Sequence, residues 1–422
     1  MIEYLIDEGI VKEMGSRYAQ FDRGHTMLDQ LEDASLLEGS RDDEDYGYVK
    51  MHDLIWDMAV KIMNESGGAM VQAGAQLTEL PDVRWWREEL LRVSLMENRI
   101  ENIPTDFSPM CPRLSTLLLC RNYKLNLVED LPEGMESLKD LRYLNLDQSV
   151  VRVLRPGILS KLSKLQFLKL HQKPEVVLSV RGDEVFGLYG LETLECNFRD
   201  LEDFGFIQSG PRFSQIACKV TVGRPSFSSL EDLNYTRSKS GIIKEAWFYD
   251  LMIDNASFLS PCFSTKVVFV SCQNMRSLWP SYVFGGIQGI VHLDGSGVFY
   301  TLREIVIHKC HGMQLLLPPW LLSTLRVEVI VVEDCYNMQE MMGSEMMGSS
   351  SPRRFDKLRV LVLKKLPNLK SIYSGRLLCN SLEEITVGDC PQLTRIPITI
   401  SHSLKKIEVD PESLFNTVEH VS

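Results

Sequence analysis

Apolar residues recur with two different periods along this chain. Between residues 51 and 62, Leu54, Ile55, Met58 and Ile62 are spaced by one to four positions on one helical stripe, which predicts an amphipathic helix. From about residue 90 onward, apolar residues instead alternate in short runs of the form L-x-L, which place every second side chain of a strand on the same face. The pattern therefore predicts a helical N-terminal segment followed by many short strands.

The alternating runs share a longer frame, L-x-x-L-x-L-x-x-N/C. It begins at Leu114, Leu141, Leu165, Leu191, Leu302, Leu358 and Leu382. This is the spacing of a leucine-rich repeat. Its Asn, Cys or equivalent position, here called the anchor, recurs at Asn98, Asn122, Ser149, Lys173, Arg199, Pro225, Leu251, Cys272, Cys310, Cys335, Leu366, Cys390 and Glu412. Most steps between anchors are 21 to 27 residues, whereas steps of 38 and 31 residues imply insertions, and the frame is weakest between residues 199 and 272.

One repeat cannot bury its apolar face alone, so neighbouring coils are expected to stack around a continuous core. We therefore predict an α/β fold, a leucine-rich-repeat solenoid with a curved parallel sheet of about 12–13 repeats. Anchor side chains should point inward, which assigns the cysteines Cys272, Cys310, Cys335 and Cys390 to packing.

The first 66 residues predict a small helical subdomain of winged-helix type. Helix-like stretches at 2–14 and 26–37 precede a short strand near 46–50 and the amphipathic helix, and the second stretch opens with the capping-box-like Thr26-x-x-Asp29. A helix-stop sequence, NESGG, follows at residues 64–68. We accordingly expect a winged-helix-like module at 1–66, a linker at 67–89 and the repeat domain at 90–422.

Composition narrows the class of protein. Lys plus Arg number 45 against 57 for Asp plus Glu, a formal net charge of −12, which argues against a nucleic-acid partner. No apolar run approaches the roughly 18 residues of a membrane span, and the N-terminus lacks the pattern of a signal peptide. Ten scattered cysteines without a CxxC pair indicate reduced thiols. We expect a cytoplasmic protein without an integral membrane segment.

Sites for chemistry are few. The run His308-Lys-Cys310-His311 is the densest in metal ligands, but Cys310 should point inward and His308 outward, so we expect no metal. No G-x-S-x-G nucleophile elbow occurs, so we expect no catalytic residues and no enzyme activity. The Met-rich stretch 341–352 fits a contact surface or a flexible insertion, and the basic run 353–376 fits either an acidic partner or a solvated coil edge.

The concave face of the predicted sheet is the best candidate for binding. Residues two, four and six before each anchor should line it, and large aromatic side chains there have no core to fill. The candidate partner-binding residues are Tyr143, Phe167, His171, Trp247, Tyr249, His308 and Lys364. For Trp247 and Tyr249 the frame is ambiguous, because a slip of one residue would bury both side chains.

Two stretches together resemble one family. YVKMHDLIWDMA at 48–59, with LIDEGIV at 5–11 and LEDASLLE at 31–38, is similar to the winged-helix subdomain and MHD motif of plant intracellular nucleotide-binding leucine-rich-repeat disease-resistance receptors of the coiled-coil class. FDKLRVLVLKKLPNLKSI at 355–372 and LEEITVGDCPQL at 382–393 resemble the same family's repeats.

The resemblance implies an immune receptor whose repeats bind a pathogen effector, or a guarded host protein, and restrain a nucleotide switch. It would make His52, with Asp53 beside it, a sensor of bound ADP, and the predicted helix start suits an anion. The alternative is that Asp53 caps the helix and His52 lies on the surface. No G-x-x-x-x-G-K-[ST] phosphate loop occurs in the sequence, so the chain resembles a receptor truncated at its N-terminus.

Several expectations follow from that missing loop. ADP or ATP would bind only in a complete receptor. In that receptor, this chain would also make an intramolecular contact with the nucleotide-binding core. The resemblance also implies a peripheral position at the inner plasma membrane for the complete receptor. The alternative is a stand-alone interaction scaffold or decoy without a nucleotide switch.

Overall fold

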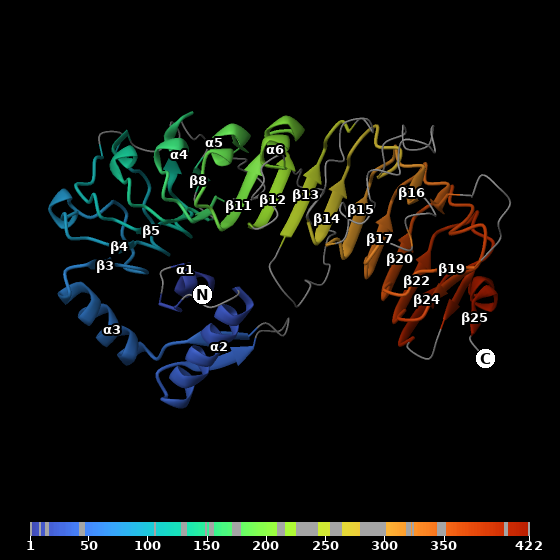
Figure 1. Ribbon diagram of the computed structural model, residues 1–422, viewed down its shortest axis with the longest axis horizontal. Helices are drawn as coiled ribbons and strands as arrows, with labels where there is room; N and C mark the ends of the chain where they lie inside the picture. The colour runs from blue at the N-terminus through green and yellow to red at the C-terminus, as the bar shows by residue number, and fades with distance from the viewer. Residues whose placement is uncertain are drawn as a thin grey trace. The chain divides into compact units, whose positions relative to one another are not determined.

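The structure, a computed structural model, describes most of the chain. The described residues are 2–7, 10–12, 17–41, 47–104, 107–127, 133–147, 150–151, 156–170, 179–208, 216–224, 244–253, 264–278, 301–317, 322, 325–343, 352–400 and 404–420. They fall into two compact units: the first holds residues 1–179, 184–196 and 239–241, and the second holds 180–183, 197–238 and 242–422. Each unit is described by itself below (Figure 1).

The N-terminal module of the first unit has the expected winged-helix elements. They are α1 (Ile2–Asp7), α2 (Arg17–Asp33), the antiparallel pair β1 (Glu38–Arg41) and β2 (Gly47–Lys50), and α3 (Asp53–Glu65). Helix α2 starts nine residues before the predicted cap at Thr26. Thr26 is therefore an interior residue, and its hydroxyl donates to the Asp22 carbonyl at 2.9 Å instead of capping a helix.

Parallel strands follow the module in the first unit. They are β3 (Ala69–Val71), β4 (Arg92–Ser94), β5 (Thr116–Leu118), β7 (Tyr143–Asn145), β9 (Phe167–Lys169) and β11 (Thr193–Phe198), with β6 (Asn126–Leu127), β8 (Val150–Val151), β10 (Ser179–Val180), α4 (Ile158–Lys161) and α5 (Gly182–Phe186) between them. Ala69 pairs with Arg92 across β3 and β4. The sheet thus begins inside the stretch we expected to be a linker, one strand before the coil whose anchor is Asn98.

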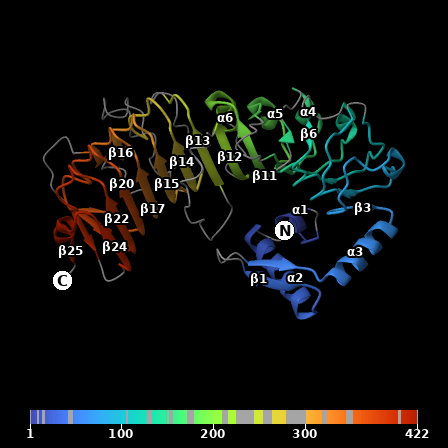
Figure 2. The same cartoon turned by 180° about the vertical axis from the view of Figure 1, so that it is seen from behind.

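The second unit repeats this pattern with longer strands. Its helix is α6 (Leu201–Gln208), and the strands are β12 (Ala217–Gly223), β13 (Lys244–Tyr249), β14 (Lys266–Val270), β15 (Glu304–His308), β17 (Val329–Glu333), β20 (Val360–Lys364), β22 (Glu384–Gly388) and β24 (Lys406–Val409). Smaller parallel sheets join β16 (Leu315–Leu317) with β18 (Glu340–Met342), and β19 (Arg353–Arg354), β21 (Leu377–Cys379), β23 (Ile398–Ile400) and β25 (Glu419–His420). Figure 2 shows the strands from behind.

The predicted register is confirmed at seven anchors whose side chains are buried, which are Asn98, Asn122, Cys272, Cys310, Cys335, Leu366 and Cys390. It is wrong at Arg199 and Glu412, whose side chains are exposed. Ile305, Ile330, Leu361 and Ile385 align across four strands, and all four side chains are fully buried. Aromatic rings continue this core, where Phe248 stacks on Phe269 at 4.9 Å and meets Phe204 of α6 edge-on at 5.5 Å. The alternation of the L-x-L runs therefore sets which side chains are inside.

Anchor side chains bond the backbone of neighbouring coils. Asn98 Nδ2 donates to the carbonyl of Gln72 at 2.8 Å, and Asn98 Oδ1 accepts from the amide of Leu77 at 3.0 Å. A cysteine anchor replaces the donor of this pair of hydrogen bonds, since the Cys272 thiol donates to the Phe248 carbonyl of the preceding coil at 3.4 Å. Burial raises the pKa of the Cys335 thiol to about 12, so it stays protonated as a donor. The packing role predicted for these cysteines is confirmed.

The turn after each of these strands has a constant backbone. The residue immediately before the anchor has a positive φ of 51 to 60° at eight coils: Glu97, Arg121, Asp250, Ser271, Lys309, Asp334, Lys365 and Asp389. Such angles are uncommon outside glycine and disfavour β-branched side chains. We call these eight positions the turn row.

Candidate recognition surface

Strand alternation gives the sheet a second face, opposite the aliphatic core, which we call the non-core face. Tyr143, Phe167, Trp247, Tyr249, His308 and Lys364 all lie on it, as predicted, because their neighbours in each strand point into the core. His171 lies outside the described residues. The ambiguous frame at Trp247 and Tyr249 is thereby resolved in favour of the original register.

Tyr143 and Phe167 are not exposed, which corrects our expectation for this pair. Only 7% and 3% of their surfaces are accessible, and their rings stack at 3.9 Å with an interplanar angle of 5°. They are register partners on adjacent strands, and the flanking partners Thr116 and Thr193 are buried too. Aromatic residues at the same register therefore cover each other, which leaves little area for a partner.

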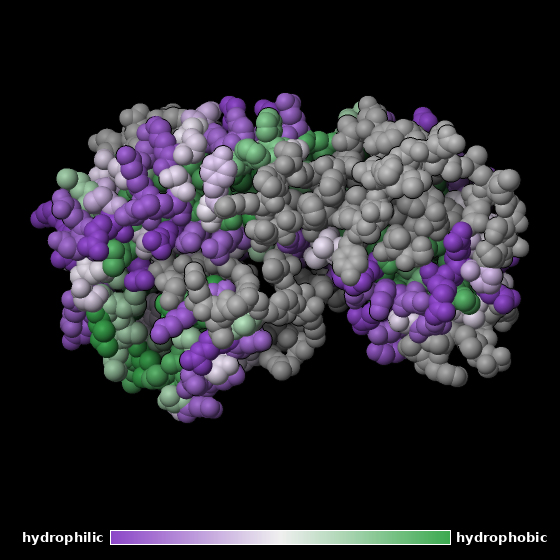
Figure 3. Space-filling model, viewed as in Figure 1, coloured by the Kyte–Doolittle hydropathy of each residue, from purple (hydrophilic) through white to green (hydrophobic). Residues whose placement is uncertain are grey.

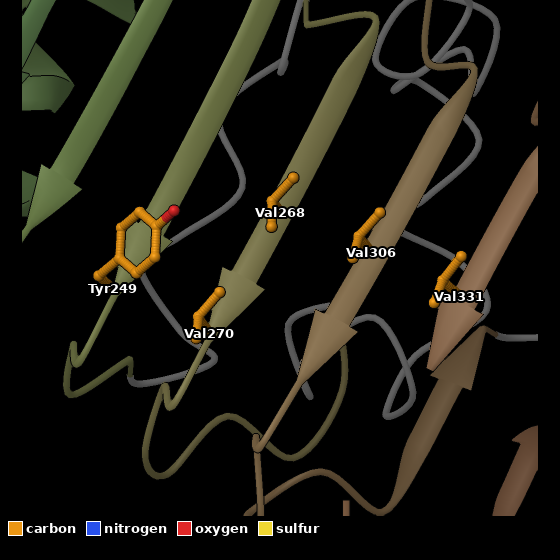
Figure 4. Packing of buried hydrophobic residues seen from close by; sticks show 5 residues of the cluster. All are labelled: Tyr249, Val268, Val270, Val306 and Val331. Carbon is orange, nitrogen blue, oxygen red and sulfur yellow. The ribbon is translucent and has the colours of Figure 1, made fainter. Parts of the chain in front are cut away.

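The same correction applies in the second unit at Tyr249 and His308. They are 3% and 5% exposed, and burial raises the pKa of the Tyr249 hydroxyl. Tyr249 belongs to a buried apolar cluster with Val268, Val270, Val306 and Val331, which Figure 4 shows on four neighbouring strands. Trp247 packs against this cluster and is only partly buried. Of the predicted partner-binding residues in this unit, Lys364 alone is exposed.

The sequence does hold a signal for this cluster that we did not use. Strands β14 and β17 read KVVFV and VIVVE, with apolar residues on both faces. Near-continuous apolar runs are typical of strands covered on both sides. The L-x-L frame describes only the core face, so it is silent about Val268 and Val331.

Charged groups lie at the other end of these strands on the same face. Lys266 Nζ is 3.2 Å from Glu304 Oε2, with the two side chains only 5% and 8% exposed. Trp247 Nε1 donates to Glu245 Oε2 at 3.1 Å, and Lys266 Nζ lies 5.5 Å from the Trp247 ring centre. Burial raises the pKa of Glu304 despite the nearby ammonium group, so this pair is held at a desolvation cost.

An accessible groove lies along the turn row of the second unit, where sequence reasoning did not look. It has a volume of about 550 Å³. Its lining residues come from the turns after β17, β20, β22 and β24, and they are Asp334, Tyr336, Lys365, Pro367, Asp389, Cys390, Pro391, Asp410 and Pro411. We call it the turn groove.

The turn groove combines an aromatic ring with acidic groups. Tyr336 is 50% exposed and stacks on His311 at 4.2 Å. A hydrogen bond to Asp334 raises the pKa of the Tyr336 hydroxyl. An exposed aromatic residue held in place by neighbours, between carboxylates, suits contact with a protein surface that carries cationic side chains.

His52 and Asp53 lie at the start of α3, as predicted, but the capping roles are exchanged. His52 is the N-cap, and its Nδ1 accepts from the Leu54 amide at 3.3 Å. Asp53 is in the first helical turn, and both residues are exposed. An accepting Nδ1 places the proton of the neutral imidazole on Nε2, which leaves one donor for another group.

Helix α3 presents its apolar stripe to solvent. Leu54, Met58 and Ile62, spaced four residues apart, are 68%, 59% and 63% exposed, and no residue of α3 is buried. Figure 3 shows hydrophobic residues gathered over this helix. A contiguous exposed apolar stripe of this kind is typical of a surface that another domain covers.

Neither a metal centre nor a membrane span is found in the part of the chain that the structure describes. Within it, no three His, Cys, Asp or Glu side chains converge as metal ligands, and no helix is both long and apolar enough to cross a bilayer.

Comparison with known proteins finds similarity to plant disease resistance proteins. Residues 286–409 match a family described as plant disease resistance protein RPS2-like, leucine-rich repeats. Disease resistance protein RPS5 of Arabidopsis thaliana is 26% identical over 430 residues, covering 94% of this chain and 47% of that protein. Disease resistance protein RFL1 of the same plant is 27% identical over 462 residues, covering 97% and 48%.

Among solved structures, one match is the functional domain of InlJ from Listeria monocytogenes, at 12% identity and a TM-score of 0.37, covering 79% of this chain and 69% of that one. The chain spans about half the length of the curated relatives it matches. Over nearly all of its length, the chain is thus similar to plant disease resistance proteins, and residues 286–409 match their leucine-rich repeats.

Proposed function

We propose that this chain is the recognition part of a plant intracellular immune receptor, and that it works by binding a protein instead of by catalysis. The partner would be a pathogen effector or a host protein that the receptor guards. The turn groove is the observation that carries this proposal, because it pairs the half-exposed Tyr336 with carboxylates in an accessible hollow. It lies largely within residues 286–409, which match the disease-resistance family.

The groove is a better contact site than the aromatic residues of the non-core face. Those side chains are largely buried, so a partner would gain little area from them. The lining of the groove, by contrast, contains three acidic residues, Asp334, Asp389 and Asp410, and one basic residue, Lys365. This balance favours a partner surface with lysine or arginine side chains beside an apolar residue that meets Tyr336.

A pull-down against a panel of pathogen effectors, with the complete chain as bait, tests this role. Effectors that bind are measured again with Tyr336→Ala and Asp389→Lys. We expect each change to weaken binding at least tenfold, while Tyr123→Ala, which removes another half-exposed tyrosine in the first unit, should leave it unchanged. Equal binding by all variants would contradict the groove as the contact site.

We further propose that the chain restrains a nucleotide switch in the complete receptor, through a contact made by α3. Its exposed stripe of Leu54, Met58 and Ile62 supports an intramolecular contact with a nucleotide-binding core. His52 would then place its Nε2–H beside an ADP phosphate, together with Asp53 at the helix start. The chain by itself has no phosphate loop in its sequence, so calorimetry of the isolated chain with ADP should register no binding, and micromolar affinity would contradict this assignment.

Co-purification with a separately expressed nucleotide-binding core of the same receptor tests the contact. We expect Leu54→Glu with Met58→Glu to abolish association, because two carboxylates would have to enter an apolar contact. Lys61→Ser, on an exposed ion pair of the same helix, is the control and should bind normally. Failure of the unmodified chain to associate would favour a stand-alone scaffold or decoy.

A further inference from the structure

A small pocket in the first unit gathers positive charge. It has a volume of about 280 Å³ and lies where β4, β5 and β7 begin. Arg92, Arg113, Arg142 and Lys164 line it, and Asp140 is the acidic residue in its lining. Four cations against one carboxylate stand out in a chain whose formal net charge is −12. We call it the cationic pocket.

The repeat frame brings these side chains together. Arg113, Asp140 and Lys164 each precede the first leucine of their repeats, so successive coils stack them in one row. Arg142 follows such a leucine, and its amide donates to the Ser115 carbonyl of the preceding coil at 2.8 Å. The backbone under the pocket is thus fixed by the parallel ladder, and little ordering is needed before a ligand binds.

The single acid of the pocket is already engaged. Lys164 Nζ is 2.6 Å from Asp140 Oδ1, and this hydrogen bond, with the charges of Lys164, Arg142 and Arg113, lowers the pKa of Asp140. Other exposed cations of the same unit have an acidic partner, as in the contact between Arg121 and Glu97 at 2.7 Å. Arg113 and Arg142 therefore add positive charge to the pocket beyond the ion pair of Lys164 with Asp140.

We propose that the cationic pocket binds a small molecule that carries two or more phosphate groups. Guanidinium groups from separate coils can each meet phosphate oxygens in a bidentate way, which suits arginine better than lysine at such sites. The pocket volume admits a compact anion and not a folded partner. Exposure of Arg113, Arg142 and Lys164 leaves the ligand an open approach. This site is separate from the turn groove and does not depend on it.

Calorimetry of the complete chain with pyrophosphate and with inositol hexakisphosphate, in about 150 mM NaCl so that unspecific attraction is screened, tests the proposal. We expect saturable binding with one site. The variant Arg113→Gln with Arg142→Gln should weaken it at least tenfold, whereas Arg121→Gln, which removes an exposed arginine that is already paired, should not change it. Absence of binding, or equal binding by the double variant, would overturn the proposal.

A variant that is expected to increase the affinity distinguishes loss of the site from misfolding, because misfolding can only weaken binding. Asp140→Asn removes the one carboxylate of the pocket, so it should tighten binding several-fold, and unchanged or weaker binding would count against the site. Flotation with phosphatidylcholine vesicles containing phosphatidic acid separates the two sources of phosphate. Binding to free pyrophosphate but not to vesicles supports a soluble ligand, and binding to vesicles alone would refute it.

Discussion

The anchor at Asn98 allows the stability of one coil to be calculated from its contacts. Its amide oxygen accepts from the Leu77 amide, and its amide nitrogen donates to the carbonyls of Gln72 and Leu95 at 2.8 and 3.1 Å. Asn98 is only 4% exposed, so Asn98→Ala leaves these groups without their partner in a largely dry site. At about 1 kcal/mol for each hydrogen bond, and more for a buried amide without an acceptor, we expect a loss of about 2–5 kcal/mol.

The variant Asn98→Cys distinguishes the contribution of the side-chain donor from that of the side-chain acceptor. A thiol occupies the anchor in four later coils and donates to a carbonyl. Asn98→Cys should therefore keep a weak donor but lose the acceptor for Leu77, and its cost should fall between zero and that of Asn98→Ala.

Hydrogen exchange measured by mass spectrometry on peptides covering residues 72–98 is the suitable assay, because repeat arrays open coil by coil. Urea unfolding followed by circular dichroism gives the global value. Asn102→Ala, an exposed asparagine nearby, is the matched control. If Asn98→Ala exchanged no faster than Asn102→Ala, or if Asn98→Cys were as damaging as Asn98→Ala, the account of the anchor as a hydrogen-bonding unit would be refuted.

Three further outcomes follow from charges and thiols. Lys266→Ala should lower the unfolding free energy of the second unit by about 3–5 kcal/mol in urea, because it leaves the buried Glu304 carboxylate without its cation. The double variant Lys266→Met with Glu304→Leu should recover most of this loss, and no recovery would argue against a desolvation cost. Arg359 and Lys405 lower the pKa of Glu383 to about 2, so the stabilising effect of this carboxylate should be present above about pH 4.5 and be lost as pH falls toward 2. Glu383→Gln should therefore differ from the unmodified chain in melting temperature at pH 6 and match it near pH 2; a constant difference would contradict the pairing. Burial of the nine described cysteines should prevent their reaction with Ellman's reagent at pH 7.5 until urea is added, and rapid reaction of several native thiols would contradict their placement.

The fold was predictable because one short-range pattern decides it. Leucine or isoleucine at every second strand position, repeated every 21 to 27 residues, leaves stacking of coils as the way to bury them. The same pattern placed Trp247 and Lys364 on the correct face of the sheet. It did not locate β3, since Ala69–Val71 contains no leucine or isoleucine of the L-x-x-L-x-L frame.

The candidate site was less predictable because burial depends on neighbours from other coils. A single repeat shows that Tyr143 leaves the core, but only the register with Phe167 shows that the two rings cover each other. Likewise the turn groove and the cationic pocket join side chains from successive coils, and insertions of varying length hide their alignment in the linear sequence. The stripe on α3 was visible in the sequence, but its exposure was not.

The turn row also bears on how such a surface can diversify. A positive φ, which disfavours valine, isoleucine and threonine, is shared by Lys309, Asp334, Lys365 and Asp389. Both signs of charge nevertheless occur among these four residues. Mutations there can reverse the charge that an incoming protein meets without disturbing the ladder beneath. Under the proposed function, exchange of lysine and aspartate along this edge would change which partner is bound, while the hydrogen-bonded strands of the array stay unchanged.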